Sequence, residues 1–159
     1  MLAPVILASD KTNLLQFGGN KQAWPVYLTI GNILKAIWHQ PSSHGSILIG
    51  YLPVTKLTSF SEGAWSNAQR RLFHQAMRNL LQPLVAAGHN SVLMTCADAK
   101  VHKIFPILAE YVADYPEQCL VACCSENQCL KCTVWWRERG ENKSSTPRTV
   151  ESFKTMLEC

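Results

Sequence analysis

The sequence lacks several features that would place it in a common class. It has no run of 18 or more apolar residues, which excludes a conventional transmembrane helix. Its amino terminus has no basic stretch and Asp10 interrupts the first apolar run, so no signal peptide is expected. Charged residues make up only 16% of the chain, which argues against disorder. No internal repeat and no separate DNA-binding module, such as a helix-turn-helix, is recognisable.

What remains is the composition of a single globular domain. The chain has 159 residues, of which 47% are hydrophobic, and this is enough to bury a core. A formal net charge of +4 permits nucleic-acid binding without requiring it. Seven cysteines without an export signal indicate thiols or metal ligands rather than disulfides.

The first third of the chain is predicted to be β-rich. Short apolar runs containing Val, Ile and Leu predict strands over residues 5–9, 25–33 and 46–52. Short turns separate these runs, so the three strands are expected to form an antiparallel meander.

The middle of the chain is predicted to be mainly helical. Apolar residues recur at a four-residue interval over residues 66–87, which is typical of an amphipathic helix, and Gly88 is expected to end it. A strand over residues 91–96 is predicted next, followed by a second helix over residues 100–112 that Pro106 would bend or split.

Two aspartates each follow a short apolar run directly. Asp10 ends the first predicted strand and Asp98 follows the fourth. Three strands, a helix, a strand and a helix is the layout of a ribonuclease-H-like domain, in which the first and fourth strands are neighbours, and by pattern alone this is one option among several α/β folds. The two carboxylates are therefore expected to meet and to suit a divalent metal ion, which points to phosphoryl transfer. The alternative interpretation is that each aspartate only ends a strand, forms a turn or caps a helix.

Cysteine is concentrated after Tyr115. Cys129 and Cys132 have zinc-knuckle spacing, and further ligands must come from the cysteines just upstream. These candidate ligands are Cys119, Cys123 and Cys124. The alternative is a set of buried or incidental thiols. The expected organisation is a partial core over residues 1–115, a knuckle over 116–137, and a polar loop with the start of a helix over 138–159.

Five segments of the chain resemble the Plavaka transposases, which are CACTA-related DNA transposases of mushroom-forming fungi. The segments are Pro4-Val-Ile-Leu-Ala-Ser-Asp-Lys-Thr12, Trp24-Pro-Val-Tyr-Leu-Thr-Ile-Gly-Asn-Ile33, Ile47-Leu-Ile-Gly-Tyr-Leu-Pro53, Cys96-Ala-Asp98 and Ala113-Asp-Tyr-Pro-Glu-Gln-Cys119. The resemblance extends over about residues 4–132. It implies a DDE-type transposase with a ribonuclease-H-like core, a nuclear location and transposon-end DNA as substrate.

The resemblance also implies roles for individual residues. Asp10 and Asp98 would be the first two acidic residues of the triad and would hold Mg²⁺ or Mn²⁺, while the cysteines would hold structural Zn²⁺. The third acidic residue lies further downstream in the family, so the chain is expected to be a fragment that is inactive alone. The family usually has glycine after the second aspartate, where this chain has Ala99.

Other polar residues are candidate DNA contacts or surface charges. Lys11, Arg70 and Arg71 are candidate phosphate contacts, although a solvated surface is the default interpretation of such residues. The downstream acids are interpreted as surface charge; they are Glu110, Asp114 and Glu117. A second hypothesis is a domesticated, non-catalytic, zinc-stabilised domain that binds DNA, itself or a full-length transposase.

Overall fold

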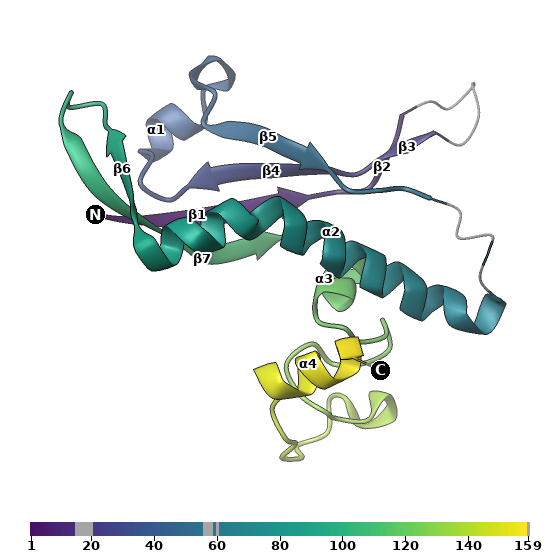
Figure 1. Ribbon diagram of the computed structural model, residues 1–159. Coiled ribbons are helices and arrows are strands. Elements are labelled where there is room, and N and C mark those ends of the chain that lie inside the picture. Colours follow the sequence, from purple (N-terminus) through teal and green to yellow (C-terminus); the bar gives the residue numbers. More distant parts are fainter. Residues whose placement is uncertain (15–20, 56–58, 60, 159) are drawn as a thin grey trace. The chain divides into compact units, whose positions relative to one another are not determined.

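The computed structural model describes residues 1–14, 21–55, 59 and 61–158 (Figure 1). The chain divides into two compact units, which are described separately below. Unit 1 comprises Met1–Thr55 and Gln75–Val112, and unit 2 comprises Lys56–His74 and Ala113–Cys159. The long helix α2 (Glu62–Asn90) contributes its first half to unit 2 and its second half to unit 1.

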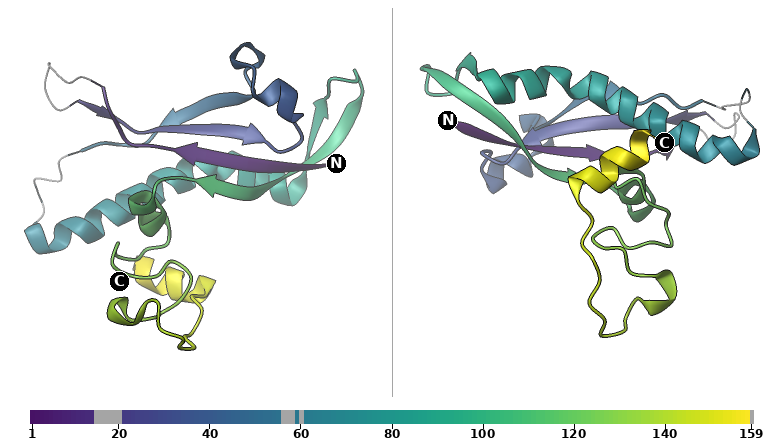
Figure 2. Two further views of the ribbon diagram at one scale, coloured as in Figure 1. Left: turned by 180° about the vertical axis from the view of Figure 1, so that it is seen from behind. Right: turned by 60° about the horizontal axis from the view of Figure 1, so that its bottom comes forward.

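Unit 1 is built on a five-stranded sheet with strand order β5-β4-β1-β7-β6 (Figures 1 and 2). Its strands are β1 (Leu2–Ser9), β4 (Pro25–Ile30), β5 (Ser46–Tyr51), β6 (Val92–Thr95) and β7 (Val101–Val112). The strands β1, β4 and β5 pair antiparallel in succession, so the predicted meander is confirmed.

Shorter elements connect the strands of unit 1. A separate two-stranded ladder joins β2 (Thr12–Asn13) to β3 (Gln22–Ala23). A one-turn helix α1 (Lys35–Trp38) and a 3₁₀ turn η1 (Pro41–Ser43) fill the connection between β4 and β5.

The core of unit 1 lies between the sheet and the second half of α2. Alternate residues of β1 are buried, as expected for a strand with one covered face; they are Ala3, Val5, Leu7 and Ser9. The helix packs closely, because a Cβ at Gly88 would lie 3.0 Å from the carbonyl oxygen of Pro106 in β7. The predicted helix over residues 66–87 is confirmed but is longer, and Gly88 lies inside it rather than at its end.

The predicted helix over residues 100–112 is wrong. These residues form β7, a strand of 12 residues that pairs antiparallel with β6 and parallel with β1. Pro106 fits because the amide of Phe105 faces β1, donating to the carbonyl of Met1 at 2.9 Å. The next nitrogen therefore faces the other side, where the β6 ladder has already ended at Ile104.

Unit 2 consists of the first half of α2 and a chain of short elements. These are α3 (Tyr115–Val121), the 3₁₀ turn η2 (Trp136–Glu138) and α4 (Val150–Glu158). The α4 helix confirms the start of a helix expected within residues 138–159. An isolated bridge between Cys132 and Pro147 ties the cysteine-rich segment to the strand-like chain before α4.

Candidate functional site

Asp10 lies exposed at the carboxyl end of β1 in unit 1. Its carboxylate accepts a hydrogen bond from the hydroxyl of Thr12, at 3.3 Å. Beneath it, the hydroxyl of the buried Ser9 is hydrogen-bonded to the phenol of Tyr111 in β7. Asp10 is therefore exposed to solvent directly after β1. The residue before it, Ser9, is fixed to the neighbouring strand β7.

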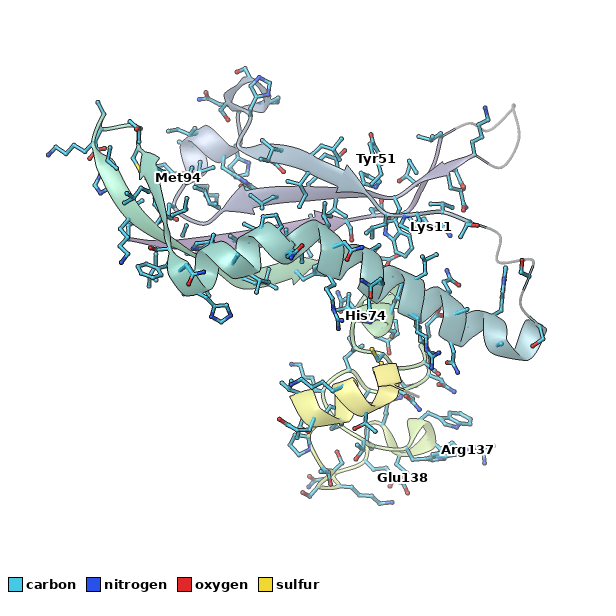
Figure 3. The ribbon with its side chains drawn as sticks, in the orientation of Figure 1. Lys11, Tyr51, His74, Met94, Arg137 and Glu138 are labelled. Atoms are coloured by element: carbon cyan, nitrogen blue, oxygen red, sulfur yellow. The ribbon has the colours of Figure 1, made fainter. Side chains whose placement is uncertain are left out.

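Lys11 follows this aspartate and lies next to the end of β1 (Figure 3). Its ammonium group lies over the ring of Trp24, 5.7 Å from the ring centroid, in a cation–π contact. The side chain is thus directed onto a buried indole, and no ion pair between Lys11 and Asp10 occurs among the described residues.

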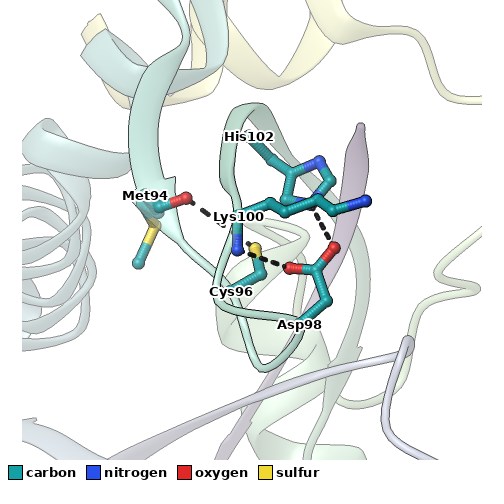
Figure 4. A network of polar contacts seen from close by, with 5 residues as sticks. All are labelled: Met94, Cys96, Asp98, Lys100 and His102. Carbon is teal, nitrogen blue, oxygen red and sulfur yellow. Dashed lines mark hydrogen bonds and ion pairs between the residues drawn. The ribbon is translucent and has the colours of Figure 1, made fainter.

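Asp98 lies in the tight turn between β6 and β7 (Figure 4). One carboxylate oxygen accepts the backbone amide of Lys100 at 3.1 Å, and the other lies 2.8 Å from Nε2 of His102. The His102 hydrogen bond is the main reason that the pKa of Asp98 is below its usual value. Asp98 therefore stabilises the hairpin turn through these local bonds.

The structure does not bring Asp10 and Asp98 together. The strand next to β1 is β7, not the strand that precedes Asp98. In the parallel register Leu2 is opposite Phe105 and Ala8 is opposite Val112. Asp98 precedes the start of β7, whereas Asp10 is level with the end of β7. At about 3.3 Å per residue, the length of β7 separates the two aspartates by roughly 35 Å. The expectation failed because the chain reverses in a hairpin after β6 instead of entering a helix.

A different aspartate follows the strand that pairs with β1. Asp114 comes two residues after Val112, the last residue of β7. Its Oδ1 accepts the backbone amide of Glu117 at 2.9 Å and so caps the amino terminus of α3. The sequence carried the signal, since an apolar, β-branched run ends at Asp114 as it does at Asp10. Because residues 100–112 are predicted to be a helix from the sequence, Asp114 is not recognised there as an aspartate that follows a strand.

The other two downstream acids differ from each other. Glu110 is exposed on β7, in keeping with its interpretation as surface charge. Glu117 is buried at the start of α3, so its interpretation as a solvated surface residue is wrong.

The cysteines of unit 2 fall into neighbouring pairs. Burial, reinforced by the adjacent Cys119, raises the pKa of Cys124 to about 11. A hydrogen bond with Ser145, with smaller contributions from the Val134 backbone and Cys129, lowers the pKa of Cys132. The remaining candidate, Cys123, lies elsewhere: its Sγ is 3.1 Å from Nε2 of His74.

This arrangement does not by itself form a metal centre. Among the described residues, no three His, Cys, Asp or Glu side chains are grouped closely enough to hold a metal ion. The two cysteine pairs each supply two sulfur ligands, whereas a structural zinc site needs four ligands. A divalent ion on the aspartates would likewise depend on ligands beyond two carboxylates.

Comparison with known proteins identifies the family. A family model described as Plavaka transposase matches residues 1–159, the whole chain. The chain belongs to the Plavaka transposase family. A search of curated proteins found no match. A search of solved structures found none either.

In this Plavaka transposase-family chain, the basic residues of unit 2 form the remaining candidate site. Arg70 and Arg71 lie on the first half of α2 and line a groove of unit 2 together with Arg148. No ion pair joins them to a carboxylate within the part of the chain that the structure describes. In the part of the chain that the structure describes, no helix qualifies as a membrane-spanning segment.

Proposed function

We propose that this chain contributes the first two acidic residues of a metal-dependent DNA strand cleavage and transfer site. The observation that carries the proposal is the parallel pairing of β1 with β7. Because the strands are parallel, their carboxyl ends lie at one edge of the sheet, and ligands of such sheets bind beyond that edge. Asp10 follows β1 there, and Asp114 is the second residue after β7.

The strand arrangement supports this assignment. Three successive antiparallel strands, with the first also paired in parallel to a later strand, are the features expected of a ribonuclease-H-like core. The later strand is β7 rather than β6, which favours Asp114 over Asp98 as the second acidic position. The family match supports DNA as the substrate and phosphoryl transfer as the reaction class.

Both aspartates retain oxygen atoms for a cation. Asp10 uses one oxygen in a long contact with Thr12, and Asp114 uses Oδ1 to cap α3. Carboxylate oxygens are the ligands that Mg²⁺ and Mn²⁺ prefer, and such ions activate the attacking oxygen and stabilise the leaving one. Asp10 directly follows β1 of the sheet, and Asp114 is held locally by its cap of α3.

Mn²⁺ binding measured by isothermal titration calorimetry tests the proposal. We expect Asp10→Asn and Asp114→Asn each to weaken Mn²⁺ binding by about 10-fold or more, because even the outer-shell partner of a metal ligand contributes about 10–100-fold to metal affinity. Asparagine caps a helix as well as aspartate does, so Asp114→Asn keeps the α3 cap. Asp98→Asn is the matched control and should retain the affinity. Loss of Mn²⁺ binding in Asp98→Asn but not in Asp114→Asn would overturn the assignment.

A second candidate function is DNA or transposase binding without cleavage. The arginines that line the groove of unit 2 favour DNA binding, because no ion pair joins them to a carboxylate among the described residues. The cysteine spacing supports a Zn²⁺ ion that stabilises the domain. Salt-dependent DNA binding that survives Asp10→Asn, with no Mn²⁺ binding by the unaltered chain, would favour this candidate. Either function operates on DNA, so we propose a nuclear location.

A further inference from the structure

Unit 2 carries a groove lined by cationic, aromatic and polar side chains. Its volume is about 870 Å³, within the range of sites that hold small ligands or short polymer segments. Three arginines and two tryptophans line it, along with amide and hydroxyl side chains. None of the described lining residues is acidic. This combination selects against a cationic or purely apolar ligand.

The arginines come from two separate segments of unit 2. Arg70 and Arg71 are adjacent on α2, and Arg148 lies just before α4. Arg148 is held in place, because its Nε donates to the carbonyl of Cys129 at 2.9 Å and its Nη2 donates to Gln128 at 3.3 Å. Both acceptors are neutral, so the guanidinium charge is oriented but not neutralised. Such a guanidinium is suited to a phosphate group.

The tryptophans add flat, exposed surfaces. Trp135 is 60% exposed and Trp136 is 43% exposed, although both line the groove. Their ring centroids are 6.4 Å apart and the planes are tilted by 40°. The guanidinium of Arg137, labelled in Figure 3, lies over Trp136 at 4.8 Å and covers part of that ring. The ring of Trp135 is thus open for stacking, and it lies next to the ring of Trp136, which carries the Arg137 guanidinium.

We propose that this groove binds unpaired nucleotides of a DNA strand, with the arginines on phosphates and the tryptophans stacked on bases. Base stacking on aromatic side chains and a cationic track for the backbone together characterise sites for single strands. A duplex does not satisfy the tryptophans, because its base faces are already stacked on one another. The choice of DNA as the strand rests on the proposed function, whereas the groove's preference for unpaired nucleotides does not.

The test is binding of fluorescein-labelled (dT)₁₂ and of a duplex of equal length, measured by fluorescence anisotropy without added Mg²⁺ or Mn²⁺. The full chain should bind the single strand more tightly, and binding should quench tryptophan fluorescence. Trp135→Ala should weaken single-strand binding about 5- to 160-fold, since each stacked base contributes about 1–3 kcal/mol. Trp135→Phe should retain most of the affinity, which separates stacking from a folding defect.

Charge is tested on the same helix with a matched pair of variants. Arg71→Gln should weaken binding and reduce the slope of log K against log salt by about 0.7, the value for one phosphate contact on a single strand. Arg78→Gln removes the same charge from α2 outside the groove and should change neither quantity.

The possible outcomes separate this inference from the proposed function. Equal affinity for single strand and duplex, unchanged by Trp135→Ala, would overturn the groove assignment. Equal losses of affinity in Arg71→Gln and Arg78→Gln would show that the binding is non-specific charge attraction. This result would also overturn the groove assignment. No Mg²⁺ or Mn²⁺ is added in this assay, so binding should persist in Asp10→Asn. Intact DNA binding by a chain that does not bind Mn²⁺ would therefore refute only the cleavage proposal.

Discussion

Replacing Gly88 by alanine is expected to leave unit 1 no more stable, or to destabilise it, although alanine is the better helix former. In an exposed helix interior this change would add about 1 kcal/mol of stability. Here the new Cβ would lie 3.0 Å from the carbonyl oxygen of Pro106, closer than an ordinary carbon–oxygen contact of about 3.3–3.6 Å. Forcing a methyl group into a packed site costs about 1–3 kcal/mol. The net expectation is a loss of about 0–2 kcal/mol.

Urea unfolding followed by circular dichroism measures this loss. With a slope of about 2 kcal/mol per M, the midpoint should stay the same or fall by up to about 1 M. Ala86→Gly is the control, because Ala86 is exposed on the same turn and its loss should cost about 1 kcal/mol through propensity alone. A midpoint that rises by about 0.5 M in Gly88→Ala would refute the close packing of α2 on β7.

Two further predictions concern the β6–β7 turn and the cysteines. Ala99 has φ of 60°, a left-handed conformation that costs a non-glycine residue about 1 kcal/mol. Ala99→Gly should therefore raise the urea midpoint. An unchanged or lower midpoint would contradict the turn geometry. Alkylation with iodoacetamide at pH 8, mapped by mass spectrometry, should modify Cys132 before Cys124, because a lowered pKa gives more thiolate at a given pH and a pKa of about 11 gives almost none. In urea the two rates should converge, and equal rates in the folded chain would argue against the described environments.

The meander and the long helix were predictable because local pattern and tertiary structure agree there. The β1 segment alternates buried and less buried residues, and residues 66–87 repeat at helical spacing. The ends of α2 were less predictable. Gly88 is a common helix stop, but here its missing side chain serves the contact with Pro106, and the chain leaves the helix at Ser91, where φ is 63°.

The β7 strand was the main failure of prediction, and its cause is the proline. Pro106 was interpreted as a bend in a helix, whereas it occupies a strand position whose nitrogen faces away from β1. Side-chain pattern alone does not reveal this, because which nitrogen lacks a partner depends on where β6 ends. Once residues 101–112 are a strand, Asp98 becomes a turn residue and Asp114 becomes the aspartate after the strand.

The groove of unit 2 was only partly predictable. Arg70 and Arg71 were identified as candidate phosphate contacts from charge, but Arg148 lies 77 positions further along the chain and its role depends on bonds to Gln128 and Cys129. The two tryptophans were visible in the sequence, and only the fold places them in the same groove as these arginines.

The position of a bound Mn²⁺ ion tests the central claim most directly. Crystals of the chain soaked in Mn²⁺ and measured for anomalous scattering should show the ion at the carboxyl end of β1, with Asp10 and Asp114 as ligands. The peak should vanish in crystals of Asp114→Asn and persist in crystals of Asp98→Asn. An ion held by Asp98 and His102 at the hairpin, with none at Asp10, would contradict the account.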